Sequence, residues 1–466
     1  MMVDTVDTRP GQWLLAVKDN IDTRDMKTTA ASKFLRQHEP PSDATIVQQL
    51  RDRGAVIVGK TNMDEFGMGS HSTNSHFGPV LNPNFPGTAR SPGGSSGGSA
   101  VAVRLGEALV ALGTDTGGSI RLPAAYTGIF GYKPSYGMLS RNGVIKYADS
   151  LDTVGLLASS AEVLFHTVFT SKLAWEHDEK DSTSLSPASR ARCLGDPDAL
   201  LQNVHKAVRT SSGANLTIGI PQDYFIEQLD PLIRDAWERA EQALHNWGAR
   251  IVPVELPSTQ SALSAYYVLA PSEAASNLAR YDGQRYGTKG LGSYSEIRGE
   301  HFGREVQNRV LMGTFSLSSG KMDNYFLKAA KVRGLVRRDF DRVFALPNPL
   351  YEVEAFDLSE MPDRVELQDK KGPAQVDFLL CPTAPTFPPR IEDVKKQDPT
   401  DSYMNDVFTV PASLAGLPAI SVPVQVEGTE ETGPVTGLQL IGQAWDDARL
   451  LLLAGRLYDL LAQKDR

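Results

Sequence analysis

The segment Ala214–Pro257 carries the signals of a strand, a helix and a second strand in succession. The run LTIGI is typical of a buried strand. Asp230 followed by Pro231 marks a helix start, because Asp caps a helix N-terminus and proline fits the first helical position. Apolar residues then recur at helical spacing, Gly248 ends the helix, and ARIVPVEL returns as a strand. This alternation predicts an α/β fold.

The same alternation recurs elsewhere in the chain. TIVQQLRDRGAVIVGKTN predicts a helix to Asp52 and then a strand, and near the end GLPAISVPV and TGLQLIGQ predict strands before a closing helix in DARLLLLAGRLYDLLAQ. No internal repeat or clean domain boundary is visible. We therefore expect one domain over 1–466, with polar surface insertions near 175–200 and 347–375.

The composition excludes several classes of function. With 41% hydrophobic and 22% charged residues the chain is typical of a globular protein, and no apolar run is long enough to span a bilayer. A net charge of −9 argues against a broad basic surface for nucleic acid. Two distant cysteines, Cys193 and Cys381, exclude a thiolate metal site, and we expect no metal. The first residues resemble neither a signal peptide nor a mitochondrial presequence.

The most informative region is Arg90–Tyr126, RSPGGSSGGSAVAVRLGEALVALGTDTGGSIRLPAAY. A flexible linker is one interpretation, but both glycine clusters adjoin strongly apolar runs, unlike a linker. A phosphate-binding loop is another, but neither cluster has the Lys and Ser/Thr that the P-loop places after its last glycine. The third interpretation is a catalytic loop, which we favour.

In that interpretation, GTDTGGS leads from the strand EALVALG into a tight turn that ends on Ser119. Consecutive N–H groups of Thr116, Gly117, Gly118 and Ser119 can converge on one point, as an oxyanion hole requires. The two glycines let a substrate carbonyl approach closely. Ser119 is therefore a candidate nucleophile.

A serine nucleophile needs a base. Among the eight histidines, His71 and His76 lie in a polar loop, and none has an acidic neighbour that suggests a relay. Three others, in helical patterns, are interpreted as structural: His166, His205 and His245. A lysine made neutral by burial can serve instead, and Lys18, at the end of the apolar run WLLAV, is the candidate; an ordinary surface lysine is the alternative.

These motifs resemble the amidase signature family, whose members carry a lysine on AVKDN, then Gly-Gly-Ser-Ser-Gly-Gly, then Gly-Gly-Ser-Ile-Arg. All three occur here in that order. The resemblance implies a large mixed β-sheet covered by helices on both faces. It implies Ser119 as nucleophile and Lys18 as final base. Ser95, after a cis peptide bond at Gly94, would relay the proton, and Ser96 would support the network.

Later segments resemble a subgroup of the family, the glutaminase subunits of tRNA-dependent amidotransferases. They are KTNMDEFGMGSHSTNSHFGPVLNP, SEAASNLARYDGQRYG, VLMGTFSLSSGKMDNYFLKAAKVR and NDVFTVPASLAGLPAISVP. Glutamine has a charged head, so its pocket needs a cation and an anion. By position, the resemblance implies Arg309 for the carboxylate, Asp406 for the ammonium and Tyr266 to close the pocket.

The subgroup also implies two partners: an amidotransferase B subunit, together with a small C- or F-type subunit. The chain itself would hold no cofactor. The B subunit, with ATP and magnesium, would use the ammonia to convert Glu-tRNA(Gln) to Gln-tRNA(Gln), so tRNA is reached only through the partner, and no membrane is involved. The long insertions suggest a fungal-type protein of the mitochondrial matrix.

The chain departs from the family in two places. Its start is shorter than the several dozen residues usual before the lysine, so we expect a shortened N-terminus, and GSHSTN at Gly69–Asn74 replaces a GSST pattern. Two alternative functions stay open. One is a free-standing amidase for small or apolar carboxamides, and the other is a non-enzymatic assembly protein.

Overall fold

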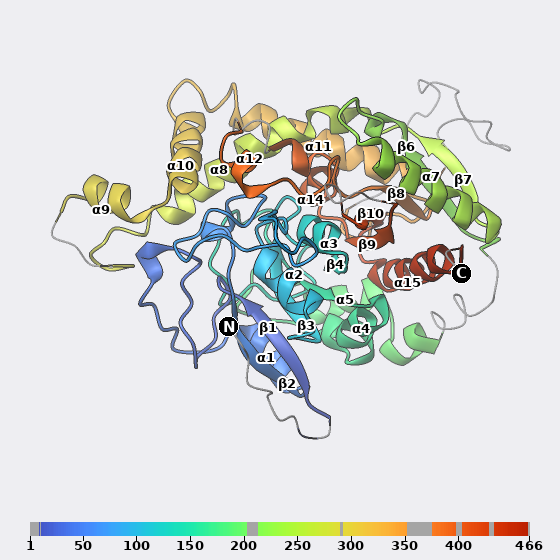
Figure 1. Ribbon diagram of the computed structural model, residues 1–466, viewed down its shortest axis with the longest axis horizontal. Helices are drawn as coiled ribbons and strands as arrows, with labels where there is room; N and C mark the ends of the chain where they lie inside the picture. Colours follow the sequence, from blue (N-terminus) through green and yellow to red (C-terminus); the bar gives the residue numbers. More distant parts are fainter. Residues whose placement is uncertain are drawn as a thin grey trace.

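The computed structural model describes residues 9, 11–202, 213–288, 292–351, 375–397, 403–427 and 433–464. Within them, ten strands form one sheet in the order β2-β1-β3-β5-β4-β9-β10-β8-β6-β7 (Figure 1). The strands are β1 (Trp13–Lys18), β2 (Ala55–Thr61), β3 (Val110–Asp115), β4 (Phe130–Lys133), β5 (Thr153–Ala158), β6 (Thr217–Pro221), β7 (Arg250–Val254), β8 (Phe378–Pro382), β9 (Ala419–Gln425) and β10 (Val435–Gly442).

The sheet is mixed. Its two ends are parallel, since β1 pairs in parallel with β2 and β3, and β6 with β7 and β8, whereas the strands between them pair antiparallel. The helices are α1 (Thr45–Arg51), α2 (Gly97–Arg104), α3 (Arg121–Thr127), α4 (Ala161–Phe165), α5 (Pro187–Leu194), α7 (Pro231–Asn246), α8 (Ala262–Leu278), α9 (Tyr294–His301), α10 (Arg304–Leu317), α11 (Phe326–Val343), α12 (Ile391–Val394), α14 (Val410–Leu414) and α15 (Asp447–Lys464).

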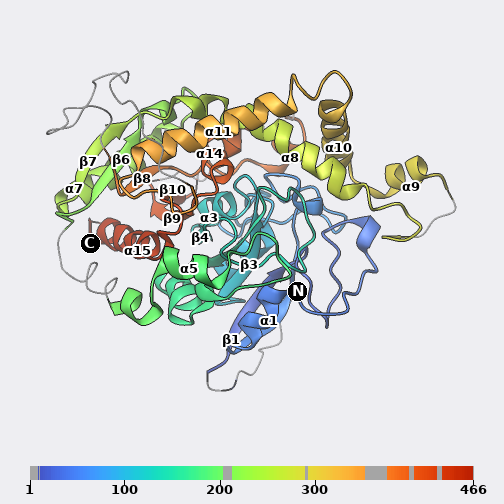
Figure 2. The same cartoon turned by 180° about the vertical axis from the view of Figure 1, so that it is seen from behind.

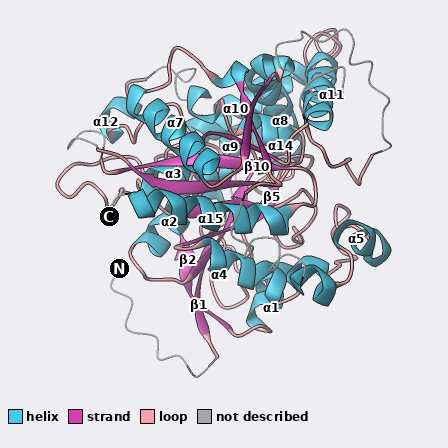
Figure 3. Cartoon of the chain, turned by 90° about the vertical axis from the view of Figure 1, so that its right-hand side faces the viewer, coloured by secondary structure: helices cyan, strands magenta, loops and turns pink. Residues whose placement is uncertain are grey.

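Helices cover both faces of this sheet (Figure 3). Side chains alternate between the faces of a strand, so positions 437 and 442 of β10 point to opposite sides. A side chain at Gly437 would meet Ala125 of α3, and one at Gly442 would meet Leu450 of α15. The predicted α/β fold class, with helices on both faces of a large mixed sheet, is confirmed.

The predicted strand–helix–strand unit is present as β6, α7 and β7. The Asp230 carboxylate accepts a hydrogen bond of 2.9 Å from the Leu232 N–H, which caps the helix start. Gly248 follows the last turn with φ of +104°, a conformation that favours glycine. Local sequence chemistry therefore determines both ends of α7.

The segment near 175–200, expected to be a surface insertion, is anchored to the main body. Arg190 on α5 is buried, and its guanidinium donates hydrogen bonds to the carbonyls of Gly137, Met138 and Ala174. Most of the other expected insertion, 347–375, lies outside the described residues. In the described part of the chain, no helix combines the length and apolar character needed to cross a membrane.

Candidate active site

The sheet brings the lysine and the glycine-rich turn together. Strands β1 and β3 are parallel neighbours, and Lys18 ends the first while Asp115 ends the second. The carboxyl ends of parallel neighbours lie at the same edge of a sheet, so the turn at Thr116–Ser119 begins beside Lys18. Ser95 enters from the loop before α2.

The Lys18 ammonium group is completely buried and points at two serines. Its Nζ lies 2.7 Å from Ser95 Oγ and 2.8 Å from Ser96 Oγ. The Lys18 Nζ also lies 3.0 Å from Thr114 Oγ1. Burial lowers the pKa of Lys18 from 10.5 to about 7, against nearby carboxylates that raise it, chiefly that of Asp64. A large fraction of this lysine is therefore neutral near pH 7 and able to accept a proton.

The loop that carries Ser95 is held by Ser72 and Asp64. The peptide bond Gly94–Ser95 is cis. The Ser72 hydroxyl donates to the Gly93 carbonyl at 2.8 Å and accepts from the Gly97 N–H at 3.0 Å. Asp64 in turn accepts from the Ser72 N–H at 2.8 Å. These contacts fix the Ser95 hydroxyl beside the lysine.

The turn from Thr116 to Ser119 offers free donors. Within the described part of the chain, none of its four N–H groups donates a hydrogen bond to another residue. The Thr409 hydroxyl holds the turn by donating to the Gly117 carbonyl at 2.6 Å. Gly118 has φ of +153°, and a side chain there would overlap Thr409. Such a fixed turn has the donors that an oxyanion hole requires.

A buried ion pair between Asp115 and Arg121 flanks the Thr116–Ser119 turn. The Asp115 carboxylate accepts from Arg121 through Nη2 at 2.8 Å and Nε at 3.0 Å, and both side chains are fully buried. Burial alone would raise the pKa of Asp115, but the Arg121 guanidinium brings it below its usual value. The same guanidinium donates to the Thr409 carbonyl at 2.8 Å, so it links the turn to the segment before α14.

Ser119 is partly exposed, whereas Lys18 and Ser95 are buried. Its carbonyl accepts a hydrogen bond of 3.1 Å from the Ser96 N–H, so the two motifs are adjacent. Its hydroxyl has no hydrogen-bond partner among the described residues, and the link from Ser95 to Ser119 is not closed. Such catalytic bonds commonly tighten only when substrate is bound. The structure thus joins Lys18 to Ser95 directly and places Ser119 next to them.

Arg309, predicted to bind a carboxylate, is buried on the inner side of α10. Its Nε donates to Glu305 at 2.7 Å and its Nη1 donates to the Tyr147 hydroxyl at 2.6 Å. The guanidinium also lies 5.4 Å from the ring centroid of Tyr267 and 5.5 Å from that of Tyr403. Its Nη2 makes no hydrogen bond within the described residues, so it can bind an anion.

Asp406, predicted to bind an ammonium, lies beside the Thr116–Ser119 turn. It accepts hydrogen bonds of 3.0 Å from the Ser70 and Tyr267 hydroxyls. Burial raises the pKa of Asp406 to about 6. A Cβ built on Gly118 would lie 3.4 Å from its Oδ1, which places the carboxylate next to the turn.

Tyr266, predicted to close the pocket, covers the same turn from α8. Its hydroxyl oxygen lies 2.7 Å from the position that a Cβ on Gly117 would occupy. A cavity of about 470 Å³ extends outward from Arg309 and is lined also by Ser70 and Tyr403. A volume of this order is typical of small-molecule sites.

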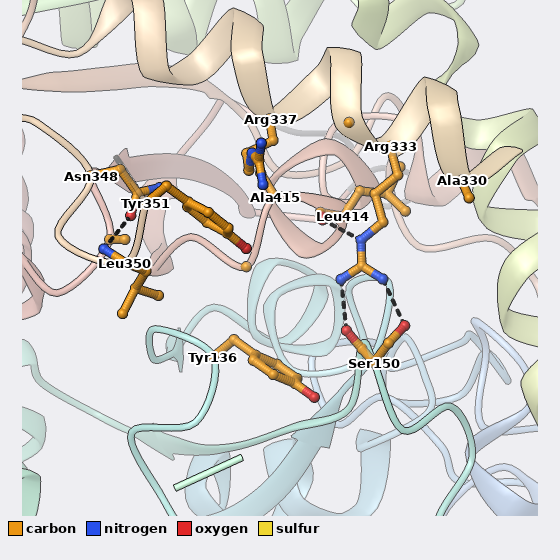
Figure 4. Close-up of a pocket in the computed structure, with 13 residues that line it drawn as sticks. Tyr136, Ser150, Ala330, Arg333, Arg337, Asn348, Leu350, Tyr351, Leu414 and Ala415 are labelled. Carbon is orange, nitrogen blue, oxygen red and sulfur yellow. Dashed lines mark hydrogen bonds between the residues drawn. The ribbon is translucent and has the colours of Figure 1, made fainter. Parts of the chain in front are cut away.

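A separate cavity of about 340 Å³ lies between α11 and α14 (Figure 4). Arg333 reaches across it and donates to the Leu414 carbonyl at 2.8 Å and to the hydroxyl and carbonyl of Ser150 at 2.6 and 2.8 Å. All three nitrogens of this guanidinium therefore have protein acceptors. Arg333 therefore connects α11 to α14 by hydrogen bonds, and it is separate from Lys18, Ser95 and Ser119.

Several contacts that organise the site were not predicted from the sequence. Ser70 and Tyr267 donate hydrogen bonds to Asp406, Tyr147 accepts one from Arg309, and Thr409 fixes the turn. Each acts on a residue far away in the chain, so no local spacing reveals it. His71, placed in a polar loop by the sequence, is buried in that loop.

The His71 ring lies between Ser91, at 3.1 Å from Nδ1, and Asn405, at 3.3 Å from Nε2. Burial lowers the pKa of His71 to about 4, so the ring is neutral near pH 7. It has no hydrogen bond to Ser119, which fits a structural role. In the described part of the chain, no group of His, Cys, Asp and Glu is arranged to hold a metal ion.

Comparisons with known proteins give a consistent result. The family model described as Amidase matches residues 14–451. A relative from Fusarium vanettenii, named as the mitochondrial A subunit of glutamyl-tRNA(Gln) amidotransferase, is 60% identical; the match covers 98% of this chain and 88% of the relative. A relative of the same name from Neurospora crassa is 53% identical, with 97% and 91% covered.

Solved structures agree. The A subunit of the glutamyl-tRNA(Gln) amidotransferase from Thermotoga maritima superimposes with a TM-score of 0.71 at 33% identity, covering 97% of this chain and 84% of that one. A structure titled simply as an amidase gives 0.70 at 27% identity, with 97% and 85% covered. Both neighbours therefore share the overall fold of this chain over nearly its whole length.

Proposed function

We infer the function of this chain from the premise that it belongs to the amidase family, whose model matches residues 14–451. It is the glutaminase component of a glutamyl-tRNA(Gln) amidotransferase and hydrolyses glutamine to supply ammonia. The observation that carries this inference is a buried anion, Asp406, beside the Thr116–Ser119 turn, together with a buried cation, Arg309, which lines the adjoining cavity with Ser70 and Tyr403. Relatives that bear this name at 60% and 53% identity support it.

The chemistry is an acyl transfer through a serine. Neutral Lys18 accepts the proton of Ser95 as Ser95 accepts that of Ser119, and Ser119 Oγ attacks the amide carbon of glutamine. The free N–H groups of the turn, among them those of Gly117 and Gly118, stabilise the oxyanion. The proton returns along the same path to the departing ammonia. Water then releases glutamate from the acyl-enzyme.

Recognition of the charged head of glutamine distinguishes it from other amides. Its carboxylate binds the free Nη2 of Arg309, and its ammonium binds Asp406. Tyr266 covers the amide end, where it packs on the turn. The side-chain amide then projects toward Ser119. An amide without a charged head leaves both buried charges unmatched, which favours glutamine over a simple carboxamide.

The partners follow from this role. The chain acts in the mitochondrial matrix in a complex with an amidotransferase B subunit, joined by a small C- or F-type subunit. Its relatives are named as mitochondrial A subunits, which supports a mitochondrial location and a complex of several subunits. The chain itself holds no cofactor, and ATP and magnesium bind the B subunit. That partner takes up the ammonia and converts Glu-tRNA(Gln) to Gln-tRNA(Gln).

The test is ammonia release from glutamine by the purified complex. Ser119→Ala should abolish release, and addition of ATP and Glu-tRNA(Gln) to the unmodified complex should yield Gln-tRNA(Gln). An unchanged glutaminase rate in Ser119→Ala would contradict the assignment. If an aliphatic amide without a charged head were hydrolysed faster than glutamine, the alternative of a free-standing amidase would replace it.

A further inference from the structure

Glu65 is a buried carboxylate that takes no part in the proton relay. It begins the short 3-10 turn η2 (Glu65–Gly67), directly after Asp64. Its Oε1 accepts a hydrogen bond from the Ser32 hydroxyl, and its Oε2 accepts one of 2.7 Å from the Gly303 N–H. A buried carboxylate is stable only with such donors, so the side chain of Glu65 is held in one position.

The contact between Glu65 and Gly303 lies at the start of α10. Gly303 is the residue before the helix, and a carboxylate there is favoured by the positive end of the helix dipole. The backbone of Gly303 has φ of −67° and ψ of 162°, which any residue can adopt. A side chain at Gly303 would nevertheless overlap Glu65 Oε2, so the close approach of Glu65 leaves no room for one.

Phe302, the residue before Gly303, docks on the same part of the chain. Its buried ring lies with its centroid 4.9 Å from that of Phe34 and 5.5 Å from that of Phe66, the neighbour of Glu65. The start of α10 is therefore seated on the segment that carries Glu65 by one polar contact and one apolar contact.

The other half of α10 is fixed by a different element. Helix α10 lies against α8 (Figure 2), and a side chain at Gly313 would overlap the Pro271 carbonyl of α8. A helix held at two points along its length has a defined position and tilt. The contact with Glu65 is the one nearer to its start.

The start of α10 determines where Arg309 lies. Arg309 follows Gly303 by less than two helical turns, about 9 Å along the helix axis. Glu305, in the first turn, accepts the hydrogen bond of 2.7 Å from Arg309 Nε. A displacement of this first turn therefore reaches the guanidinium both along the helix and through Glu305.

We propose that Glu65 is a positioning residue for glutamine recognition: it fixes the start of α10 and thereby holds Arg309 in place relative to Asp406. This rests on the proposed function, in which those two residues bind the carboxylate and the ammonium of glutamine. Glu65 acts through α10 and not on the reacting atoms. Its loss weakens binding of the charged head and leaves the chemistry at Ser119 intact.

The test is steady-state hydrolysis by the purified complex, with glutamine and with an aliphatic amide that lacks a charged head. Glu65→Ala should raise KM for glutamine at least tenfold and keep kcat within threefold, because a higher KM at unchanged kcat is the sign of lost binding. Its kcat/KM for the aliphatic amide should stay within threefold, which also shows that the variant is folded.

Two matched variants separate the contact from the charge. Glu65→Gln can still accept from the Gly303 N–H, and its amide can donate to the Ser32 hydroxyl, so KM for glutamine should return to within threefold. Glu300→Ala removes an exposed carboxylate from a cavity that Glu65 also lines, and it should leave KM within twofold.

A double-mutant cycle tests the same contact from the side of α10. Gly303→Ala places a methyl group against Glu65 Oε2 and should raise KM for glutamine as Glu65→Ala does. In the Glu65→Ala background the methyl group has room, so adding Gly303→Ala should change KM less than twofold.

The outcomes separate the two levels of inference. If the unmodified complex does not hydrolyse glutamine, the proposed function fails and the role of Glu65 fails with it. If it does, the role of Glu65 alone is overturned by a KM within threefold in Glu65→Ala, by equal losses with both substrates, or by additive effects in the cycle.

Discussion

Replacing Arg309 by methionine tests whether the buried guanidinium selects glutamine. The structure gives this side chain two protein acceptors, Glu305 on Nε and Tyr147 on Nη1, and leaves Nη2 for the substrate carboxylate. Removing one partner of a buried charge pair costs about 3 kcal/mol, which corresponds to roughly 150-fold in kcat/KM. Arg309→Lys keeps a point charge but loses the fork of donors, so we expect an intermediate loss of about tenfold.

The assay is the initial rate of ammonia release, measured with glutamine and with an aliphatic amide that lacks a charged head. Arg309→Met should lower kcat/KM for glutamine alone. The matched control is Arg304→Met, which removes the same charge from an exposed position lining the same cavity and should change the rate less than threefold. If Arg309→Met left glutamine turnover within threefold, or lowered both substrates equally, the reasoning about head-group recognition would be refuted.

Three further predictions follow from the geometry. Ser95→Ala removes the proton relay and should lower kcat about 100- to 10,000-fold with unchanged far-UV circular dichroism; wild-type turnover would contradict it. Asp406 must be ionised to bind an ammonium and has a pKa of about 6, so KM for glutamine should rise as pH falls below 6, whereas in Asp406→Asn KM should be high and independent of pH between 5 and 7. Asp230→Ala removes the cap of α7 and should lower the free energy of unfolding by about 1 kcal/mol in urea titration, with Asp235→Ala within the same helix as a control that stays within about 0.5 kcal/mol.

The sequence predicted most reliably what local chemistry determines. The ends of α7 are set by Asp230 and Gly248, residues that act on their own helix, and these boundaries could be read directly. The same holds for the strand that ends at Lys18. The candidate catalytic serines were predicted because three short motifs occur in order, which requires no knowledge of how the chain folds.

The rest depends on contacts between distant parts of the chain. Tyr147 meets Arg309 and Tyr267 meets Asp406 across more than a hundred residues, so neither could be inferred from spacing. The segment near 175–200 looked polar and superficial, yet Arg190 is buried because four backbone carbonyls accept hydrogen bonds from its guanidinium. Burial of a charge becomes favourable only when the fold supplies such partners.

The central claim is that a buried, neutral lysine activates a serine. It is tested most directly by the rate at which an uncharged fluorophosphonate labels Ser119 as a function of pH, because this probe engages neither Arg309 nor Asp406. Lys18 is neutral above its pKa of about 7, so the labelling rate constant should rise about tenfold per pH unit up to 7 and then level off, and Lys18→Met should label at least 100-fold more slowly throughout. A rate constant that is flat between pH 5 and 8.5, or Lys18→Met labelling as fast as the unmodified chain, would contradict the mechanism.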